Sequence, residues 1–174
     1  FNSLFHSISS FNGSGFDILK DTNGGSIGAI KRNPHLLNVT MILITLGSIG
    51  YPFILELFAN GKLFIQSKYK EIFFTLNFKV ILFGTVFIMI LGSLQFLFSE
   101  WTNLGTIAEE PVKDKIILSI FHSITRTAGF SLIDYNFVHN STSITTIALM
   151  FIGGSSLSVA GGIKIGTLSI IIIS

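Results

Sequence analysis

The sequence contains no cysteine, and only 11% of its 174 residues are charged. The absence of cysteine excludes a disulfide framework, a thiolate metal site and a cysteine nucleophile. The scarcity of charge argues against a soluble globular domain, in which about 25% of residues are charged. The net charge of +2 is too small to indicate nucleic acid as a partner.

Long apolar runs dominate the sequence instead. Hydrophobic residues make up 49% of the chain, and the mean hydropathy is +0.70. A bilayer core about 30 Å thick needs roughly 20 apolar residues of helix, and two runs reach this length. They are residues 36–59, whose one charge is Glu56, and residues 72–99, whose one charge is Lys79. Both are predicted to be transmembrane helices of an all-α membrane protein.

Two further segments are predicted to enter the membrane without crossing it as a continuous helix. In residues 115–131, an apolar stretch too short to span is followed by the polar run HSITRTAGFS. Residues 143–174 are apolar at both ends, as in a transmembrane span, but the glycine-rich stretch 153–166 lies between. Each glycine costs a helix about 1 kcal/mol relative to alanine, so the helix is predicted to be broken there. Irregular backbone at membrane depth survives only when it is buried in protein or lines a water-filled path. This pattern is the first indication of transport.

The distribution of charge predicts the orientation. The connection 60–71 carries three lysines against a single acid, whereas acids are in excess in the connection 100–114. By the positive-inside rule, the first connection is cytoplasmic and the second is external. The loops 17–35 and 132–142 are then external too. We therefore expect a multi-pass protein of the cell (inner) membrane.

One motif occurs twice. FHSISSFNGSGF at residues 5–16 and FHSITRTAGF at residues 121–130 share an aromatic-His-Ser-Ile start and end in a small residue, glycine and phenylalanine. Each is followed by a polar loop and an apolar span, so the repeating unit is a span, a re-entrant loop and a span. The chain would hold the end of one unit, namely its re-entrant loop and the span 36–59, and nearly all of the next unit. Because the sequence lacks an initiator methionine and stops within an apolar run, we expect it to be a segment of a longer polypeptide.

Gly15 and Gly129 end the two copies of this motif. Glycine can adopt a positive φ, which lets a loop aim successive carbonyl oxygens at one axis. A ring of such carbonyls can replace the water shell of a monovalent cation. One loop cannot close a ring, so two loops in this chain imply others in the rest of the polypeptide.

Several polar residues near these loops have two possible roles. His6 and His122 suit either a proton relay or, as we expect, hydrogen bonding to neighbouring loops. Arg126 is expected to tie loops together through carboxylates or carbonyls, since a guanidinium facing the ion path would repel a cation. Lys164 either extends to the membrane interface or holds the glycine-rich stretch through backbone carbonyls. The sequence offers no paired carboxylates, Ser/His/Asp arrangement or His/Glu cluster that would indicate an enzyme.

Three motifs together resemble one known family. They are FNGSGF at residues 11–16, RTAGF at residues 126–130 and MFIGGSSLSVAGGIK at residues 150–164. In this combination and order, the chain is similar to the Trk/Ktr/HKT superfamily of potassium transporters, specifically the bacterial membrane (pore) subunit. The third motif departs from the family's FIGGSPGSTAGGIK stretch at Leu157, where the family has glycine, and at Val159, where it has a small hydroxyl residue.

The resemblance implies four unlike span, loop and span repeats around one pore, each with a filter loop. This chain would hold the filter loop and exit helix of the second repeat and most of the third. Potassium would be bound by backbone carbonyls, principally those of Gly15 and Gly129. The filter residues would be Gly13, Ser14, Gly15, Thr127, Ala128 and Gly129, supported by Asn12, Phe16, Arg126 and Phe130.

The resemblance also implies a gate, partners and a second candidate ion, sodium. A gating loop below the filter would include Gly153, Gly154, Ser155, Ser156, Ser158, Gly161, Gly162 and Lys164. Family members form membrane homodimers and pair with a cytosolic nucleotide-binding regulatory ring. The implied function is potassium uptake by a larger subunit, surrounded by membrane lipid and completed by the remaining repeats. The alternatives are a non-conducting membrane fragment of a split or degenerate gene, and a soluble binding module.

Overall fold

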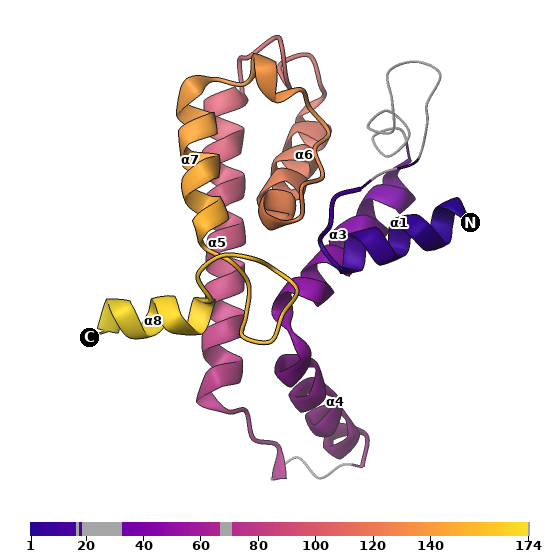
Figure 1. Ribbon diagram of the computed structural model, residues 1–174, viewed down its shortest axis with the longest axis vertical. Coiled ribbons are helices and arrows are strands. Elements are labelled where there is room, and N and C mark those ends of the chain that lie inside the picture. Colours follow the sequence, from indigo (N-terminus) through magenta and orange to yellow (C-terminus); the bar gives the residue numbers. More distant parts are fainter. Residues whose placement is uncertain (17, 19–32, 67–70, 174) are drawn as a thin grey trace.

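The computed structural model describes residues 1–16, 18, 33–66 and 71–173 (Figure 1). Within these residues the regular elements are all helices, as predicted, and one isolated β-bridge joins Ile152 and Ile163. Much of the predicted external loop 17–35 and part of the predicted linker 60–71 lie outside the described residues.

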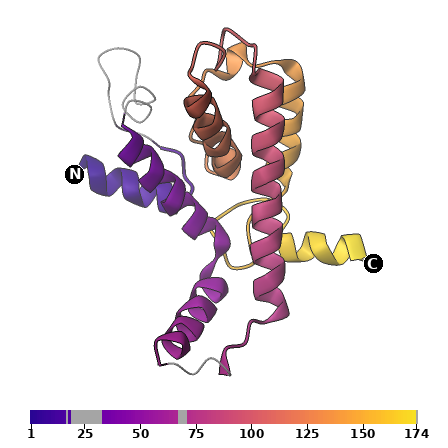
Figure 2. The same ribbon diagram turned by 180° about the vertical axis from the view of Figure 1, so that it is seen from behind.

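Helix α5 (Leu76–Glu100) is the central column of the molecule (Figures 1 and 2). It occupies most of the predicted span 72–99. In the described part of the chain it is the one unbroken helix that is long and apolar enough to cross a membrane. The helix begins sharply because the side chain of its N-cap, Thr75, accepts a hydrogen bond from Phe78 N at 3.2 Å.

Helices α6 (Val112–Ile124) and α7 (Asn140–Phe151) lie beside the upper half of α5 (Figure 1). A glycine of α5 allows the close approach of α6, because a Cβ at Gly92 would lie 2.6 Å from Ser123 Oγ. The main hydrophobic cluster lies in this upper half, and its largest fully buried side chain is Phe121 of α6. Helices α5 and α6 and the loops on either side of α6 therefore contribute most of this cluster.

Glu100 organises the C-terminal end of α5. Its carboxylate is fully buried and accepts hydrogen bonds from Asn103 Nδ2 at 2.6 Å, Thr106 Oγ1 at 2.9 Å, His139 N at 3.1 Å and Thr142 Oγ1 at 2.5 Å. A buried charge is tolerated when such donors replace its water shell. These bonds join the end of α5 to the loop that follows it and to the start of α7.

The predicted span 36–59 is not one helix. Helices α3 (Pro34–Ile49) and α4 (Tyr51–Ile65) are bent by 100° at a break between them. Gly50 has a φ of +87°, and Pro52 has no N–H to donate to the carbonyl four residues earlier. The predicted span is therefore a bent pair of helices, and the sequence Gly-Tyr-Pro is the physical reason for the bend.

Two shorter helices flank these elements. Helix α1 (Asn2–Phe11) packs along α3, and α8 (Ile165–Ile173) starts beside the lower half of α5 and runs sideways away from it (Figure 1). Gly84 of α5 makes room for α8, because a Cβ there would lie 2.5 Å from Ile165 Cγ2. Two 3-10 turns complete the described elements, namely η2 (Thr125–Thr127) and η3 (Tyr135–Phe137).

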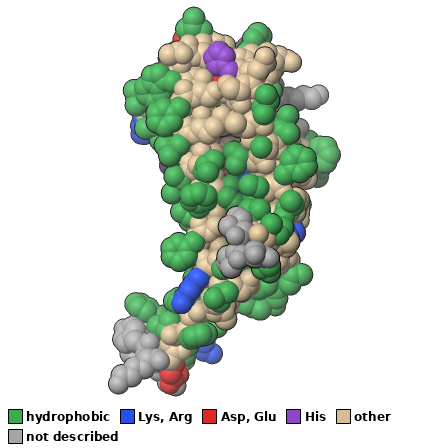
Figure 3. All heavy atoms as spheres, turned by 90° about the vertical axis from the view of Figure 1, so that its left-hand side faces the viewer, with side chains coloured by type: hydrophobic (Ala, Val, Ile, Leu, Met, Phe, Trp, Pro, Cys, Tyr) green, Lys and Arg blue, Asp and Glu red, His purple; other side chains and the backbone are tan. Residues whose placement is uncertain are grey.

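The surface carries many exposed apolar side chains. Figure 3 shows them over the whole height of one face, with few charged groups among them. On α5 alone, Phe83, Phe87 and Phe98 are 71%, 64% and 76% exposed. Apolar surface of this extent marks a region that lipid or further protein covers.

We expect Glu100→Gln to lower the free energy of unfolding by about 3 kcal/mol, because the new amide group would face donors and leave at least one without an acceptor. Denaturation of the full-length protein in detergent would measure the change. Glu109→Gln alters an exposed acid in the next loop and is the matched control. An equal, small effect of both substitutions would contradict the organising role of Glu100.

Candidate functional site

Two glycine turns lie against each other. The first glycine turn (residues 12–16) follows α1, and the second glycine turn (residues 127–130) starts at the end of η2. Gly15 has a φ of +73° and Gly129 a φ of +70°. A Cβ at Gly15 would lie 2.5 Å from Ala128 O and 2.9 Å from Gly129 Cα. The two backbones therefore touch where no side chain fits.

The rest of the two turns is close as well. A Cβ at Gly13 would lie 3.8 Å from Ala128 Cα and 4.0 Å from Thr127 O, and a Cβ at Gly129 would lie 3.8 Å from Ser14 O. Ser9 of α1 holds the first turn, since its Oγ donates to Phe16 O at 2.6 Å. The structure thus brings together the predicted filter residues, which are Gly13, Ser14, Gly15, Thr127, Ala128 and Gly129.

The residues expected to support the turns differ from one another. Phe130 is buried, and its ring meets the ring of His6 edge-on with 5.4 Å between centroids. Phe16 was expected to pack its loop in the same way but is 70% exposed. Asn12 donates from Nδ2 to Ile8 O at 3.0 Å, so its side chain bonds to its own helix rather than to the second turn.

His6 and His122 are both buried beside the turns. The ring of His122 stacks on Phe96 with 4.8 Å between centroids, and His6 Nε2 lies 3.4 Å from Thr40 Oγ1. Among the described residues, neither ring nitrogen of His122 has a hydrogen-bond partner, so the bonding expected for it is absent there. The described residues also contain no group of His, Asp and Glu side chains that could hold a metal.

Arg126 connects the second glycine turn to the segment that separates α7 from α8. The side chain is 8% exposed. It donates from Nη1 to Ser123 O at 3.2 Å, from Nε to Ile152 O at 3.3 Å and from Nη2 to Gly153 O at 3.3 Å. Of the partners expected for Arg126, carbonyls are therefore the ones observed.

The interhelical loop (residues 152–164) joins α7 to α8 and contains most of the predicted gating loop 153–166. It closes on itself through backbone hydrogen bonds. Gly153 N donates to Ile163 O at 2.9 Å, and Ile163 N donates to Phe151 O at 2.7 Å. The loop is therefore a defined structure with paired amides rather than an open connection.

Side chains and glycines within the interhelical loop complete its shape. Lys164 Nζ donates to Ala160 O at 2.5 Å, so the lysine holds a backbone carbonyl of the loop. Leu157 has a φ of 58° and is the one described non-glycine residue with a positive φ, which costs leucine about 1 kcal/mol. Gly162 also has a positive φ, of 84°. Of the other predicted gate residues, Gly153, Gly154 and Ser155 are buried, Ser158 is intermediate, and Ser156 and Gly161 are exposed.

The interhelical loop docks on the break between α3 and α4. The last carbonyls of a helix have no partner within it. Here Ser48 O accepts from Ser155 N at 3.0 Å, and Gly47 O accepts from Val159 N at 3.2 Å. In return, Tyr51 N at the start of α4 donates to the loop at 3.5 Å. Sequence reasoning missed this docking, although the Gly-Tyr-Pro sequence that causes the break is a usable signal.

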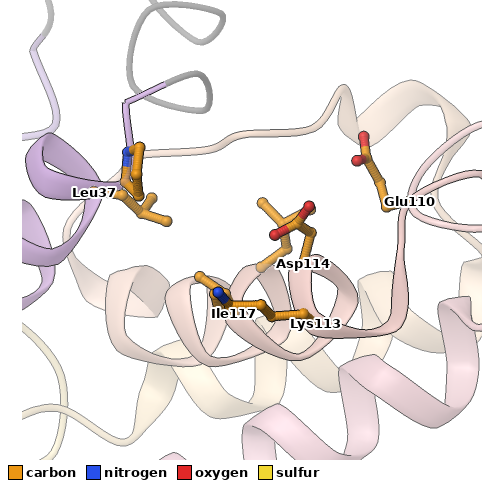
Figure 4. A pocket seen from close by; sticks show the side chains of 7 residues that line it. Leu37, Glu110, Lys113, Asp114 and Ile117 are labelled. Atoms are coloured by element: carbon orange, nitrogen blue, oxygen red, sulfur yellow. The ribbon is translucent and has the colours of Figure 1, made fainter.

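A separate hollow lies at the N-terminal end of α6 (Figure 4). It has a volume of about 310 Å³ and lies between Leu37 of α3 and Lys113, Asp114 and Ile117 of α6, with Glu110 beside it. No residue of the glycine turns lines it. It is lined by acidic and basic side chains together, so its charge does not favour either a cation or an anion.

Comparisons with known proteins agree with one another. The family model described as "TrkH: Cation transport protein" matches residues 1–174. The chain is 35% identical to the Ktr system potassium uptake protein B of Bacillus subtilis, over 100% of the chain and 37% of that protein. It is 36% identical to the potassium/sodium uptake protein NtpJ of Enterococcus hirae, over 98% of the chain and 35% of that protein. The chain thus spans little more than a third of these relatives.

A solved structure has the same fold. The crystal structure of the potassium transporter TrkH from Vibrio parahaemolyticus matches with a TM-score of 0.70 and 17% sequence identity. The match covers 98% of this chain and 34% of that one. The helical arrangement described above is therefore a known architecture for about a third of a larger chain.

We expect Gly15→Ala to lower the free energy of unfolding by about 3 kcal/mol and Gly129→Ala by about 1 kcal/mol. Both residues have a positive φ, but an added Cβ overlaps the opposite backbone only at Gly15, since the nearest atom at Gly129 is 3.6 Å away. Denaturation of the purified full-length protein would measure both. Gly61→Ala in α4, where a Cβ meets nothing within 4 Å, is the control. A Gly15→Ala protein as stable as this control would show that the turns do not touch.

Proposed function

The chain belongs to the TrkH family of cation transport proteins, and from this premise we propose that it supplies two filter loops of a potassium-uptake pore. The filter loops are the first and second glycine turns. The observation that carries the proposal is the backbone contact of Gly15 with Gly129, both with a positive φ. Two turns of this kind, from distant parts of one chain, lie together with their glycine backbones in contact.

Potassium recognition in this proposal uses only backbone carbonyls. Such oxygens replace the hydration shell of the ion and impose no formal charge on it. Gly15 and Gly129 would provide the principal carbonyls. The neighbouring carbonyls of Gly13, Ser14, Thr127 and Ala128 would complete the contribution of this chain. Since two turns cannot enclose an ion, the other repeats of the full-length protein would close the ring.

The interhelical loop is proposed as the gate below the filter. Its irregular backbone is supported by hydrogen bonds to Ser48 O, to Gly47 O and from Arg126. The loop itself is not part of a helix, so it could move without unwinding one. At membrane depth, such a backbone is stable only when it is buried or lines a path for water and ions.

The proposed setting is the cell (inner) membrane, crossed by α5 and by the bent pair of α3 and α4. The apolar faces in Figure 3 would then contact lipid and the remaining repeats. Potassium would enter the cell down the membrane potential, which is worth about 2.3 kcal/mol per charge for each 100 mV.

The ions and partners that we propose for the full-length protein are those of its relatives and of the family that it resembles. One relative is named as a potassium uptake protein and another as a potassium/sodium uptake protein, so we propose potassium as the transported ion and sodium as a second, coupling or activating ion. We also propose that the full-length protein forms a membrane homodimer and binds a cytosolic nucleotide-binding ring. No enzymatic reaction is part of this proposal.

A second candidate is a non-conducting membrane fragment of a split or degenerate transporter gene. It differs from the first candidate in that no further repeats would surround the two glycine turns. Two filter loops alone would leave the ion half uncoordinated, so such a fragment would not conduct.

We expect the complete reading frame that contains this chain to restore growth of a potassium-uptake-deficient bacterium at low external potassium. In the same protein, Gly129→Ser and Gly15→Ser are expected to lower the potassium-over-sodium uptake ratio by about tenfold, because a side chain displaces the coordinating backbone. Growth and uptake of both ions would be measured together.

Gly61→Ser is the matched control for both substitutions, since a side chain at Gly61 meets nothing within 4 Å. It should leave growth and the uptake ratio unchanged. A frame that encodes no further glycine turns and does not restore growth would refute the transporter and support the fragment.

A further inference from the structure

Arg126 directly precedes the second glycine turn, and its side chain donates two hydrogen bonds to the interhelical loop and one to α6. We propose that Arg126 is a positioning residue that holds the first residues of the interhelical loop in a fixed place below the second glycine turn. This inference rests on the function proposed above, in which the turn is a filter loop and the interhelical loop is the gate.

The geometry of the guanidinium suits a tether better than an ion pair. Its three hydrogen bonds end on backbone carbonyls, and one of these, Ser123 O, belongs to the α6 helix that leads into the turn. The other two belong to Ile152 and Gly153, where the chain leaves α7. The planar guanidinium has donors on three separate nitrogens, so it can bond carbonyls of two different segments at once. The ammonium group of a lysine has its donors on a single nitrogen.

The tether satisfies groups that would otherwise lack partners. Ile152 and Gly153 follow the last residue of α7, so their carbonyls have no acceptor role in that helix, and Ile152 has an extended conformation. Arg126 is in turn 8% exposed, and a buried guanidinium is stable only when its donors are used. Removing the side chain therefore takes away two of the hydrogen bonds that hold the start of the interhelical loop, while the contacts of Gly15 and Gly129 remain.

The connection is short on the filter side. Thr127, Ala128 and Gly129 follow Arg126 directly in the chain, and Ala128 N donates to Thr125 O at 2.8 Å, which stiffens this turn. On the other side, the interhelical loop is held by the carbonyls of α3. A displacement of the interhelical loop would thus be transmitted to the second glycine turn through Arg126.

The experiment uses the full-length protein and a spin label on the loop. Because this chain has no cysteine, Ser156→Cys provides a label site in its segment on an exposed side chain of the interhelical loop. Any cysteine elsewhere in the full-length protein would be replaced first. Label mobility in lipid vesicles is compared for the parent, Arg126→Gln and Arg126→Lys proteins. The unlabelled versions are assayed for potassium uptake.

We expect Arg126→Gln to increase the mobility of the label and to raise the maximum rate of potassium uptake by about threefold, with a change in apparent Km below about twofold, because the loop is released while the filter keeps its carbonyls. Arg126→Lys should lie between the parent and Arg126→Gln in both measurements, and it supplies assembled protein if the glutamine variant does not fold. Lys113→Gln, at an exposed lysine of α6, controls for loss of a positive charge and should change neither.

Unchanged label mobility in both Arg126 variants would overturn the tether. A rise in Km with unchanged mobility would also overturn it, because Arg126 would then act on the filter alone. If the parent protein transports no potassium, the proposed function fails, and the label measurement still decides whether Arg126 holds the loop.

Discussion

In apolar surroundings every backbone N–H and C=O needs a partner, and the interruptions in the helices of this chain satisfy that requirement for each other. At the end of α3, the carbonyls of Gly47 and Ser48 have no hydrogen-bond partner within the helix. After the end of α7, the amides of the interhelical loop have no helical partner either. Ser155 and Val159 donate to those two carbonyls. Neither interruption would be stable at membrane depth without the other, so the two helices must be broken together.

Glycine serves two different purposes around this arrangement. Gly84 and Gly92 lie within α5, where the missing Cβ allows α8 and α6 to approach. Gly15 and Gly129 have a positive φ, and there the missing Cβ allows two backbones to touch. The first pair sets how the helices pack, and the second sets which atoms face one another at the site. Glycine thus determines both the packing of the helices and the backbone geometry of the proposed filter.

Features that depend on local sequence could be predicted, and features that depend on distant partners could not. The length of α5 and the interruption after α7 follow from apolar runs and glycine content. The bend at Gly50 was missed because one Gly-Tyr-Pro sequence hardly changes the hydropathy of a long apolar run. The exposure of Phe16, and the choice of carbonyls rather than carboxylates by Arg126, depend on which distant segments lie nearby, and no local pattern contains that information.

The docking of the interhelical loop on α3 uses main-chain atoms on both sides. A point substitution changes a side chain but leaves the amide and the carbonyl where they are. Leu157 and Val159, where the family that the chain resembles has other residues, accordingly take part in the docking hydrogen bonds through their backbone atoms alone. An insertion or deletion would shift every amide past its carbonyl. Over evolutionary time, the length of this loop should accordingly be inherited more faithfully than its composition.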